Sequence, residues 1–342
     1  MSEEPTAKRA RPTPLAELFA VADDVAVTEA FLRARAAALC RALLTRCVLH
    51  AGAERLAITE LECYHRDAAA WPDPFTHGAP LQLTAARWYF HRTGASYRGG
   101  TYKGLDITCG VARTHTHGGL LVRGLRSLAD PADAVDGPCL CVERILAATG
   151  HATIADLVAA GLPGGERRAC VLDPAAALWI EDCGDALCPS VPALICTPRI
   201  GLTLKASGSD GGDGGDDDRA RREEYLFARL RVVTAATRSR KGRAHTLLAL
   251  QLCAGRSAAD AVAAAVGPGA RAADVRAAGE RAARAAAQVA GMTPKAARAR
   301  IAACHGRAFA RGEWDVLLAA AHRAGLDTPL LPNDGEDNEK KE

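Results

Sequence analysis

Apolar and polar positions follow two different periods along this chain, and the change of period separates helices from strands. Residues 27–48 place apolar side chains three and four positions apart, which predicts a helix with Thr28 as its N-cap. From residue 55 the pattern changes to short, β-branched or alternating segments bounded by Gly or Pro, as is typical of strands. The predicted strands lie within residues 55–64, 87–92, 102–110, 118–125, 192–206 and 223–234.

Helical periods return between and after these strands. Residues 139–150 and 153–161 each predict a helix, and the pattern beyond residue 254 is helical, with Ser257 and Thr293 at N-cap positions. The succession predicts an α+β fold. We expect a curved antiparallel β-sheet or barrel-like core flanked by helices, followed by a helical C-terminal region.

Composition divides the chain into four parts. Residues 1–22 are polar and charged and predict a disordered basic N-terminus. Residues 23–240 form the α+β domain, in which the low-complexity acidic stretch 206–220 predicts a disordered insert. Residues 241–327 make a basic, Ala- and Arg-rich helical region, and residues 328–342 make an acidic tail.

The net charge of +3 conceals an asymmetry. Between Arg219 and Asp327 there are 20 Lys and Arg residues against 8 Asp and Glu residues. A basic face on a nearly neutral chain is an electrostatic footprint for a polyanion. An Arg-rich helix face that only contacts water would give the same count, so charge leaves both interpretations open.

The N-terminus carries no apolar signal segment, and no apolar run reaches membrane-spanning length. We therefore expect a protein that is not secreted and has no membrane partner, with its twelve cysteines reduced. The basic run from Lys8 to Arg11 predicts a nuclear location, and without that signal we expect a cytoplasmic one.

The candidate chemistry begins in the first long strand. Alternation places Glu60, Glu62 and Tyr64 on one face of it, an unusual composition for a core face. An edge strand with this face in water is the plain alternative. However, four of the five Tyr and two of the four Trp residues lie between residues 64 and 102, which favours a pocket or stacking surface there.

These motifs and their order resemble the 3-methyladenine (alkyladenine) DNA glycosylases over roughly residues 25–235. The segments that carry the resemblance are Glu60-x-Glu62-x-Tyr64, His77, Trp88-Tyr89-Phe90-His91, Gly118 to Arg123, Gly137-Pro138 with the helix after it, and Pro198-Arg199-Ile200-Gly201. The chain resembles a divergent member of that family, because His91 stands where the family has Tyr and Asp106 about where it has Asn.

The resemblance implies the catalytic roles. Glu62 would be the general base that deprotonates the water attacking the sugar C1′. Arg123 would lie beside that carboxylate. The residues implied to bind the flipped base, or to fill the space that it leaves, are Tyr64, His77, His91, Tyr97 and Asp106.

Contacts to the DNA backbone are implied as well. The candidates are Arg98, Lys103, Arg199 and Lys205. The implied function is base-excision repair: hydrolysis of the N-glycosidic bond of alkylated or deaminated purines in double-stranded DNA by a monomeric enzyme without cofactor or metal. No Lys adjoins the motif to form a Schiff base, so we expect no strand cleavage.

Four alternatives stand beside this hypothesis. The fold could serve as a nucleic-acid or nucleotide binding protein without hydrolysis. Cys109, His115 and His117 could join other thiols in a metal site, although no spacing forms a matched zinc set. Cys63 could act as a nucleophile, although alternation turns it away from Glu62. Residues 97–104 could cradle a phosphate, although they lack the spacing of a P-loop.

Overall fold

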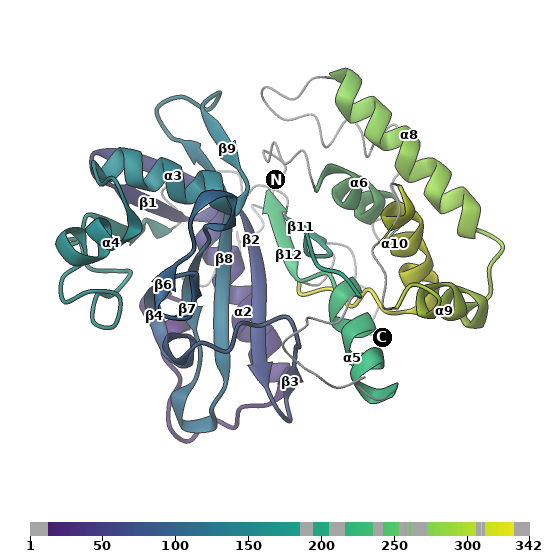
Figure 1. Cartoon of the computed structure of the whole chain (residues 1–342), viewed down its shortest axis with the longest axis horizontal. Coiled ribbons are helices and arrows are strands. Elements are labelled where there is room, and N and C mark those ends of the chain that lie inside the picture. The colour runs from purple at the N-terminus through teal and green to yellow at the C-terminus, as the bar shows by residue number, and fades with distance from the viewer. Residues whose placement is uncertain are drawn as a thin grey trace, which may run out of the picture.

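The fold is an antiparallel sheet, curled into a half-barrel, with helices around it and a helical region at one side (Figure 1). This fold is that of a computed structural model of the chain. The structure describes residues 13–184, 194–204, 216–234, 242–252, 257, 260, 272–305, 309 and 312–331. The predicted α+β class, with its curved sheet and C-terminal helices, is confirmed.

Among the residues that the structure describes, ten strands form the main sheet, with the order β10-β1-β2-β8-β7-β4 along its central path. Strand β12 pairs with both β2 and β11, while β3 joins β2 and β9 joins β8. Strands β5 and β6 make a separate hairpin. The bounds are β1 (Cys47–Ala51), β2 (Glu54–Asp67), β3 (Trp71–Pro72), β4 (Ala85–Phe90), β5 (Arg92–Thr93), β6 (Ser96–Tyr97), β7 (Leu105–Cys109), β8 (His117–Ser127), β9 (Ala134–Asp136), β10 (Leu178–Asp182), β11 (Leu194–Thr197) and β12 (Arg231–Thr234).

Helices pack on this sheet at the predicted positions 27–48, 139–150 and 153–161, and α1 packs there without having been predicted. Thr28 caps α2, its side chain accepting from the Phe31 amide at 3.2 Å. Helix α3 begins at Pro138 and ends before Gly150, whose φ of 71° suits a residue without Cβ. The elements here are α1 (Leu15–Phe19), α2 (Glu29–Thr45), α3 (Pro138–Thr149), α4 (Ile154–Asp156) with the π-helical turn η4 (Leu157–Gly161), and the 3-10 turns η1 (Pro80–Leu83), η2 (Gly100–Tyr102) and η3 (Ala112–Thr114).

The C-terminal helices form a second hydrophobic core, in which small Ala side chains let the helices approach closely. Thr293 caps α9 by accepting from the Ala296 amide at 3.2 Å, and Ser257 accepts from the Asp260 amide in the same way, as predicted. Strands β11 and β12 lie between β2 and these helices (Figure 1). The helices are α5 (Asp216–Phe227), α6 (Arg243–Leu252), α8 (Ala272–Val289), α9 (Pro294–Ala302) and α10 (Glu313–Ala324).

Three predicted boundaries are wrong. The predicted disorder of residues 1–22 fails from residue 13 onward, because Leu15 and Phe19 of α1 are buried in the main core. Residues 216–220, predicted within a disordered insert, begin helix α5. The predicted acidic tail starts too early, since Leu330 and Leu331 pack in the core of the sheet.

Two predicted strands are also too long. Residues 223–227 belong to α5, and only Arg231–Thr234 form β12. In the strand predicted within residues 192–206, β11 ends at Thr197. The residues after Thr197 leave the strand and approach Glu62 of β2, to which the Ile200 amide donates at 2.7 Å.

No helix in the described part of the chain combines the length and the apolar character needed to cross a membrane.

Candidate active site

One transverse row of the sheet carries much of the candidate chemistry. Glu62 of β2 lies opposite Leu121 of β8, which lies opposite Asp106 of β7, which in turn lies opposite Tyr89 of β4. Directly paired residues project from the same face of a sheet. Glu62, Asp106 and Tyr89 therefore share one face, together with Glu60, Tyr64 and His91, which stand two positions away on the same strands.

An irregularity between β2 and β8 positions Arg123. The pairing register shifts between Ile58 and Glu60 and again between Glu60 and Leu61, so that Arg123 has no directly paired residue on β2. Bulges of this kind re-aim a side chain. Here the Arg123 guanidinium lies between two carboxylates, with Nε at 2.8 Å from Glu60 Oε1 and at 3.3 Å from Glu62 Oε1.

Glu62 is fully buried and is held by three protein groups. The Tyr64 hydroxyl donates to its Oε2 at 2.9 Å, the Ile200 amide donates to its Oε1 at 2.7 Å, and Arg123 contacts both oxygens. Burial, with the nearby Glu62 charge, raises the pKa of Tyr64 well above its usual value, so its hydroxyl stays a donor. The carboxylate is thus fixed in orientation by charge-assisted hydrogen bonds.

Glu60 is the second buried carboxylate of this face. Burial alone would raise its pKa, but the guanidiniums of Arg231 and Arg123 outweigh burial and hold the pKa of Glu60 below its usual value. Arg231 Nε donates to Glu60 at 2.7 Å, and its Nη1 donates to the Thr197 hydroxyl at 2.8 Å. Sequence reasoning missed Arg231, since nothing in its own strand marks it as the partner of a residue 171 positions away.

A second group of the same face is built from rings. His77 lies edge-on to His91 at 4.4 Å between centroids, and Tyr89 lies 5.6 Å from His91. His91 Nε2 is 2.7 Å from Asp106 Oδ1, and the Gln82 side chain donates to Asp106 Oδ2 at 3.0 Å. Although part of His77 reaches solvent, the surrounding groups desolvate its imidazole and, together with His91, lower the pKa of His77 to about 4.

A glycine separates the carboxylate group from the ring group. Gly119 of β8 lies between Tyr64 of β2 and Thr108 of β7. A Cβ at this position would come within 2.6 Å of Asp106 Oδ2 and 3.0 Å of Gln82 Nε2. The missing side chain instead makes room for Asp106 and Gln82, whose side chains pack against this buried glycine.

The structure thus brings together most of the residues predicted for catalysis and base binding, and it sets Tyr97 apart. The tip of the β5–β6 hairpin is formed by Gly94 and Ala95, whereas Tyr97 turns inward, donating to Glu166 at 3.0 Å and contacting Phe90. The predicted insertion of Tyr97 into a duplex does not fit this position. Tyr102, which sequence reasoning did not single out, has 76% of its surface exposed.

The four predicted backbone contacts have different surroundings. Arg199 is completely buried, where it donates to Asp73 Oδ2 at 2.6 Å and lies over the Tyr64 ring, so a contact with DNA phosphate is excluded in this conformation. Lys103 pairs with Glu143 at 3.1 Å near the surface. The half-buried Arg98 donates to the Arg92 carbonyl. Lys205 lies outside the described residues.

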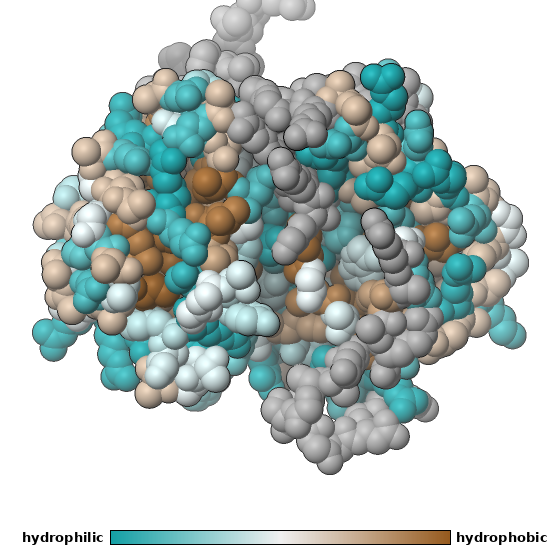
Figure 2. Space-filling view, turned by 45° about the horizontal axis from the view of Figure 1, so that its top comes forward, coloured by the Kyte–Doolittle hydropathy of each residue, from teal (hydrophilic) through white to brown (hydrophobic). Residues whose placement is uncertain are grey.

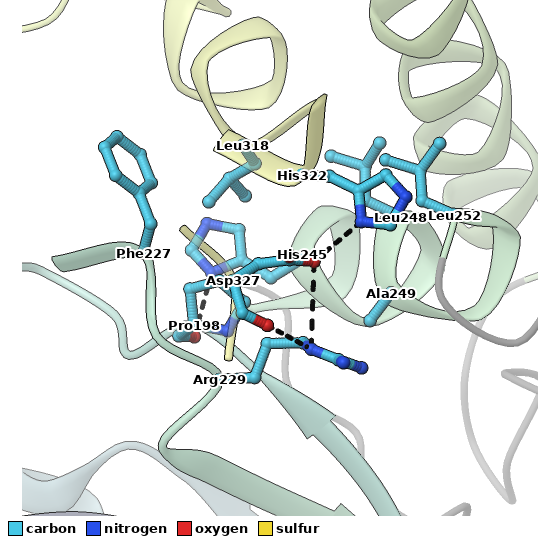
Figure 3. A pocket seen from close by; sticks show the side chains of 10 residues that line it. All are labelled: Pro198, Phe227, Arg229, His245, Leu248, Ala249, Leu252, Leu318, His322 and Asp327. Carbon is cyan, nitrogen blue, oxygen red and sulfur yellow. Dashed lines mark hydrogen bonds and ion pairs between the residues drawn. The ribbon is translucent and has the colours of Figure 1, made fainter. Parts of the chain in front are cut away.

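The N-terminal end of α6 covers one side of the carboxylate group. The Thr246 hydroxyl accepts from Arg231, and burial, with Arg231 nearby, lowers the pKa of His245 to about 3, which keeps the ring neutral beside the guanidiniums. Figure 3 shows His245 next to a cavity of about 20 Å³, where Arg229 and His322 both meet Asp327. That cavity is far too small for a nucleobase.

Two alternative chemistries find little support in the described residues. Cys63 is buried on the opposite face of β2, and its Sγ is 3.2 Å from His65 Nδ1. Burial raises the pKa of Cys63 well above its usual value, which disfavours the thiolate that a nucleophile needs. No group of three or more His, Cys, Asp or Glu side chains in the described ranges is arranged to hold a metal ion.

Comparison with known proteins adds one relative. No protein-family model matches the chain. Over 116 residues it is 31% identical to the "Uncharacterized protein L759" of Acanthamoeba polyphaga mimivirus. The match covers 30% of this chain and 53% of that relative, so the chain spans about half the length of the curated protein that it matches.

Proposed function

We propose that this protein is a DNA N-glycosylase that removes damaged purines by hydrolysis, a divergent relative of the 3-methyladenine DNA glycosylases. The observation that carries the proposal is the single face on which Glu62, with Arg123 beside it, adjoins the His77, His91 and Asp106 group. A fixed carboxylate beside a ring-lined surface is what water activation next to a flipped base requires.

The chemistry follows from the positions of the groups. The flipped purine would rest against Tyr64, His77 and His91, because an electron-poor alkylated ring stacks well on such groups. Water would attack C1′ and give a proton to Glu62, while the C1′–N bond breaks and its electron pair leaves with the purine. Arg123 would hold Glu62 in place and offset negative charge.

Base preference would depend on Asp106. Its two oxygens already meet His91 Nε2 and Gln82 Nε2, and the lone pairs that these contacts leave would accept from an exocyclic amine. Tyr102 is a better candidate than Tyr97 for stacking within the duplex, because it is the large apolar side chain most exposed among the described residues.

The DNA partner itself is a proposal. Beyond the proposed site, α8 and α9 carry exposed Arg276, Arg284 and Arg300, and hydrophilic side chains cover much of the surface of the helical region (Figure 2). These cations suit a phosphate backbone. Monomeric action and a nuclear or cytoplasmic location likewise remain part of the proposal, and the basic run from Lys8 to Arg11 lies outside the described residues.

The test is excision from a duplex oligonucleotide carrying hypoxanthine or 1,N6-ethenoadenine, with hot alkali to reveal abasic sites. We expect cleavage with the native protein and none with Glu62→Gln, while Glu62→Gln still binds the duplex. Glu17→Gln, which changes an exposed carboxylate in α1, is the matched control and should keep full activity. Absence of excision by the native protein over a broad panel of lesions would remove the enzymatic claim.

A second candidate function is binding of damaged DNA without hydrolysis. It is favoured by the complete enclosure of Glu62, whose oxygens already accept from Tyr64, Arg123 and the Ile200 amide. In that case a lesion-bearing duplex would bind without losing its base. Its affinity should fall steeply between low and physiological salt, because phosphate contacts release counterions.

A further inference from the structure

A second, larger hollow lies beside the proposed site. It has a volume of about 660 Å³, within the range of small-molecule sites. It opens between η1, the strand β4 and the segment 164–167 that follows η4. Tyr89 lines it and also contacts His77 and His91, so the two sites share one wall. The other residues of interest in its lining are Pro80, Leu81, Arg92, Val158 and Arg167.

Apolar groups form two sides of this cleft. Pro80 and Leu81 come from η1, Val158 comes from η4, and the Tyr89 ring lies on β4. Tyr89 is 4% exposed and is fixed by its ring contacts, so it borders the cleft but offers little ring surface to a ligand. The aliphatic side chains of Pro80, Leu81 and Val158 form the apolar wall, against which a flat ring such as a nucleobase would lose water from one face.

The one carboxylate in the lining is neutralised within the protein. Glu166 is buried and accepts from the Tyr97 hydroxyl, from the Phe90 amide at 2.9 Å and from Arg92. The Glu166 and Arg92 charges therefore cancel, and Glu166 does not repel an anion as a free carboxylate would.

Exposed cations stand at a glycine turn on the remaining side. Arg167 is exposed, and no hydrogen bond or ion pair joins it to another residue in the described part of the chain. Beside it, Gly164 and Gly165 have φ values of +73° and +72°, which favour glycine. The Gly165 amide donates to the Leu162 carbonyl at 2.9 Å, and the side chain of the exposed Arg168 lies against Gly164, so a second cation adjoins this turn.

We propose that this cleft binds a nucleotide, with the base against the aliphatic wall of Pro80, Leu81 and Val158 and the phosphate at Arg167, beside the Gly164–Gly165 turn. The ligand chemistry is a nucleobase joined to a phosphate. Its source is either a free nucleoside monophosphate or a 5′-terminal nucleotide of a DNA strand. This site goes beyond the proposed function and stands whether or not Glu62 supports excision.

The experiment is calorimetric titration of the full-length protein with dAMP, with deoxyadenosine and inorganic phosphate as partial ligands. A 5′-phosphorylated trinucleotide, compared with its unphosphorylated form, tests the strand source. We expect dAMP to bind more tightly than either partial ligand. Preference for dAMP over the trinucleotide identifies a free mononucleotide, and the reverse preference identifies a strand end.

Two exposed arginines give a matched pair of variants. Arg167→Glu should weaken dAMP binding by at least about tenfold, because it replaces a charge-assisted contact with repulsion. Arg41→Glu changes an exposed cation on α2, which does not line the cleft, and should leave dAMP binding within about twofold, the effect of a remote screened charge.

Three results would overturn the nucleotide site: no heat of dAMP binding, equal binding of dAMP and phosphate, or equal losses in the two variants. Glu62→Gln keeps the two proposals separate, since it should abolish excision and leave dAMP binding in the cleft unchanged.

Discussion

At the scale of single residues, Glu60 keeps its charge in a place from which water is excluded. Two guanidiniums, from Arg123 and Arg231, approach its Oε1 at 2.8 Å and 2.7 Å. A buried charge without such partners would cost several kcal/mol and would tend to be neutralised. The same cations orient Glu62 through Arg123, so the ion pairs that support the fold also shape the proposed site.

Glu60 therefore predicts a pH dependence of stability. Its folded pKa is depressed below the unfolded value of about 4.3. The stability that it contributes is present above about pH 4.3 and is lost as the pH falls through the folded pKa. Urea titrations between pH 3 and pH 6 should show a smaller loss of unfolding free energy with acid for Glu60→Gln than for the native protein. Parallel plots of unfolding free energy against pH for Glu60→Gln and the native protein would contradict this account. The plot for Glu17→Gln should have the same slope as that of the native protein.

The Arg199–Asp73 pair predicts a coupling energy. Both side chains are completely buried, and Arg199 also donates to the carbonyls of Cys63 and Tyr225. Arg199→Met leaves a lone buried carboxylate and should cost about 3–5 kcal/mol of unfolding free energy. The double variant Asp73→Asn with Arg199→Met should lose less than the sum of the single variants, as measured by urea unfolding. Additive losses would mean that the pair is not coupled.

At the scale of elements, strand β8 accommodates Asp106 and Gln82 because Gly119 has no side chain. Gly119→Ala should bring its methyl group against Asp106 and Gln82, which costs about 1–3 kcal/mol as overpacking does. Displacement of Asp106 would also disturb the surface proposed to hold the base, so binding of a lesion-bearing duplex should fall more than unfolding alone explains. Gly99→Ala is the control, because a Cβ there meets nothing within 4 Å. Native-like binding of the duplex by Gly119→Ala would show that the base does not bind beside Gly119.

Element types were predictable where a period extends over several turns or where a cap is unambiguous, as for α2 with Thr28 and α9 with Thr293. The prediction failed at residues 223–227 because Tyr225, Leu226 and Phe227 form a short apolar run that fits a strand as well as a buried helix end. The tertiary contacts of these three residues decided for the helix.

At the scale of the whole molecule, the C-terminal segment ties the helical region to the sheet. After α10 the chain returns to β12, where the Arg229 amide donates to the Thr328 carbonyl at 2.9 Å, and Leu330 and Leu331 enter the core of the sheet. Leu331→Ala should therefore lower the unfolding free energy of the protein by about 2–4 kcal/mol.

The control for this prediction is Leu140→Ala, at a position that is 49% exposed and should change the free energy by less than about 0.5 kcal/mol. Fluorescence can follow both parts, since Trp88 lies in the sheet core and Trp314 packs against the helical core. If the C-terminal segment joins the sheet to the helical region, the unfolding transitions followed by Trp88 and Trp314 fluorescence shift together in Leu331→Ala. A shift confined to Trp314 would contradict the connection.

The sequence by itself determined the fold class and the composition of the candidate face. Alternation fixes Glu60, Glu62 and Tyr64 on one side of a strand, because the period of two is a local property of the backbone. The helices at 29–45 and beyond 272 follow from local periods and caps in the same way.

Only the tertiary structure decided the partners of these side chains. It turned Arg199 from an expected phosphate contact into the buried partner of Asp73, brought Arg231 and the Ile200 amide to the two carboxylates, and turned Tyr97 toward Glu166. The physical reason is that a buried charge must find an opposite charge or a donor wherever the folded chain supplies one. Those partners lie up to 171 positions away, where no local pattern can reveal them.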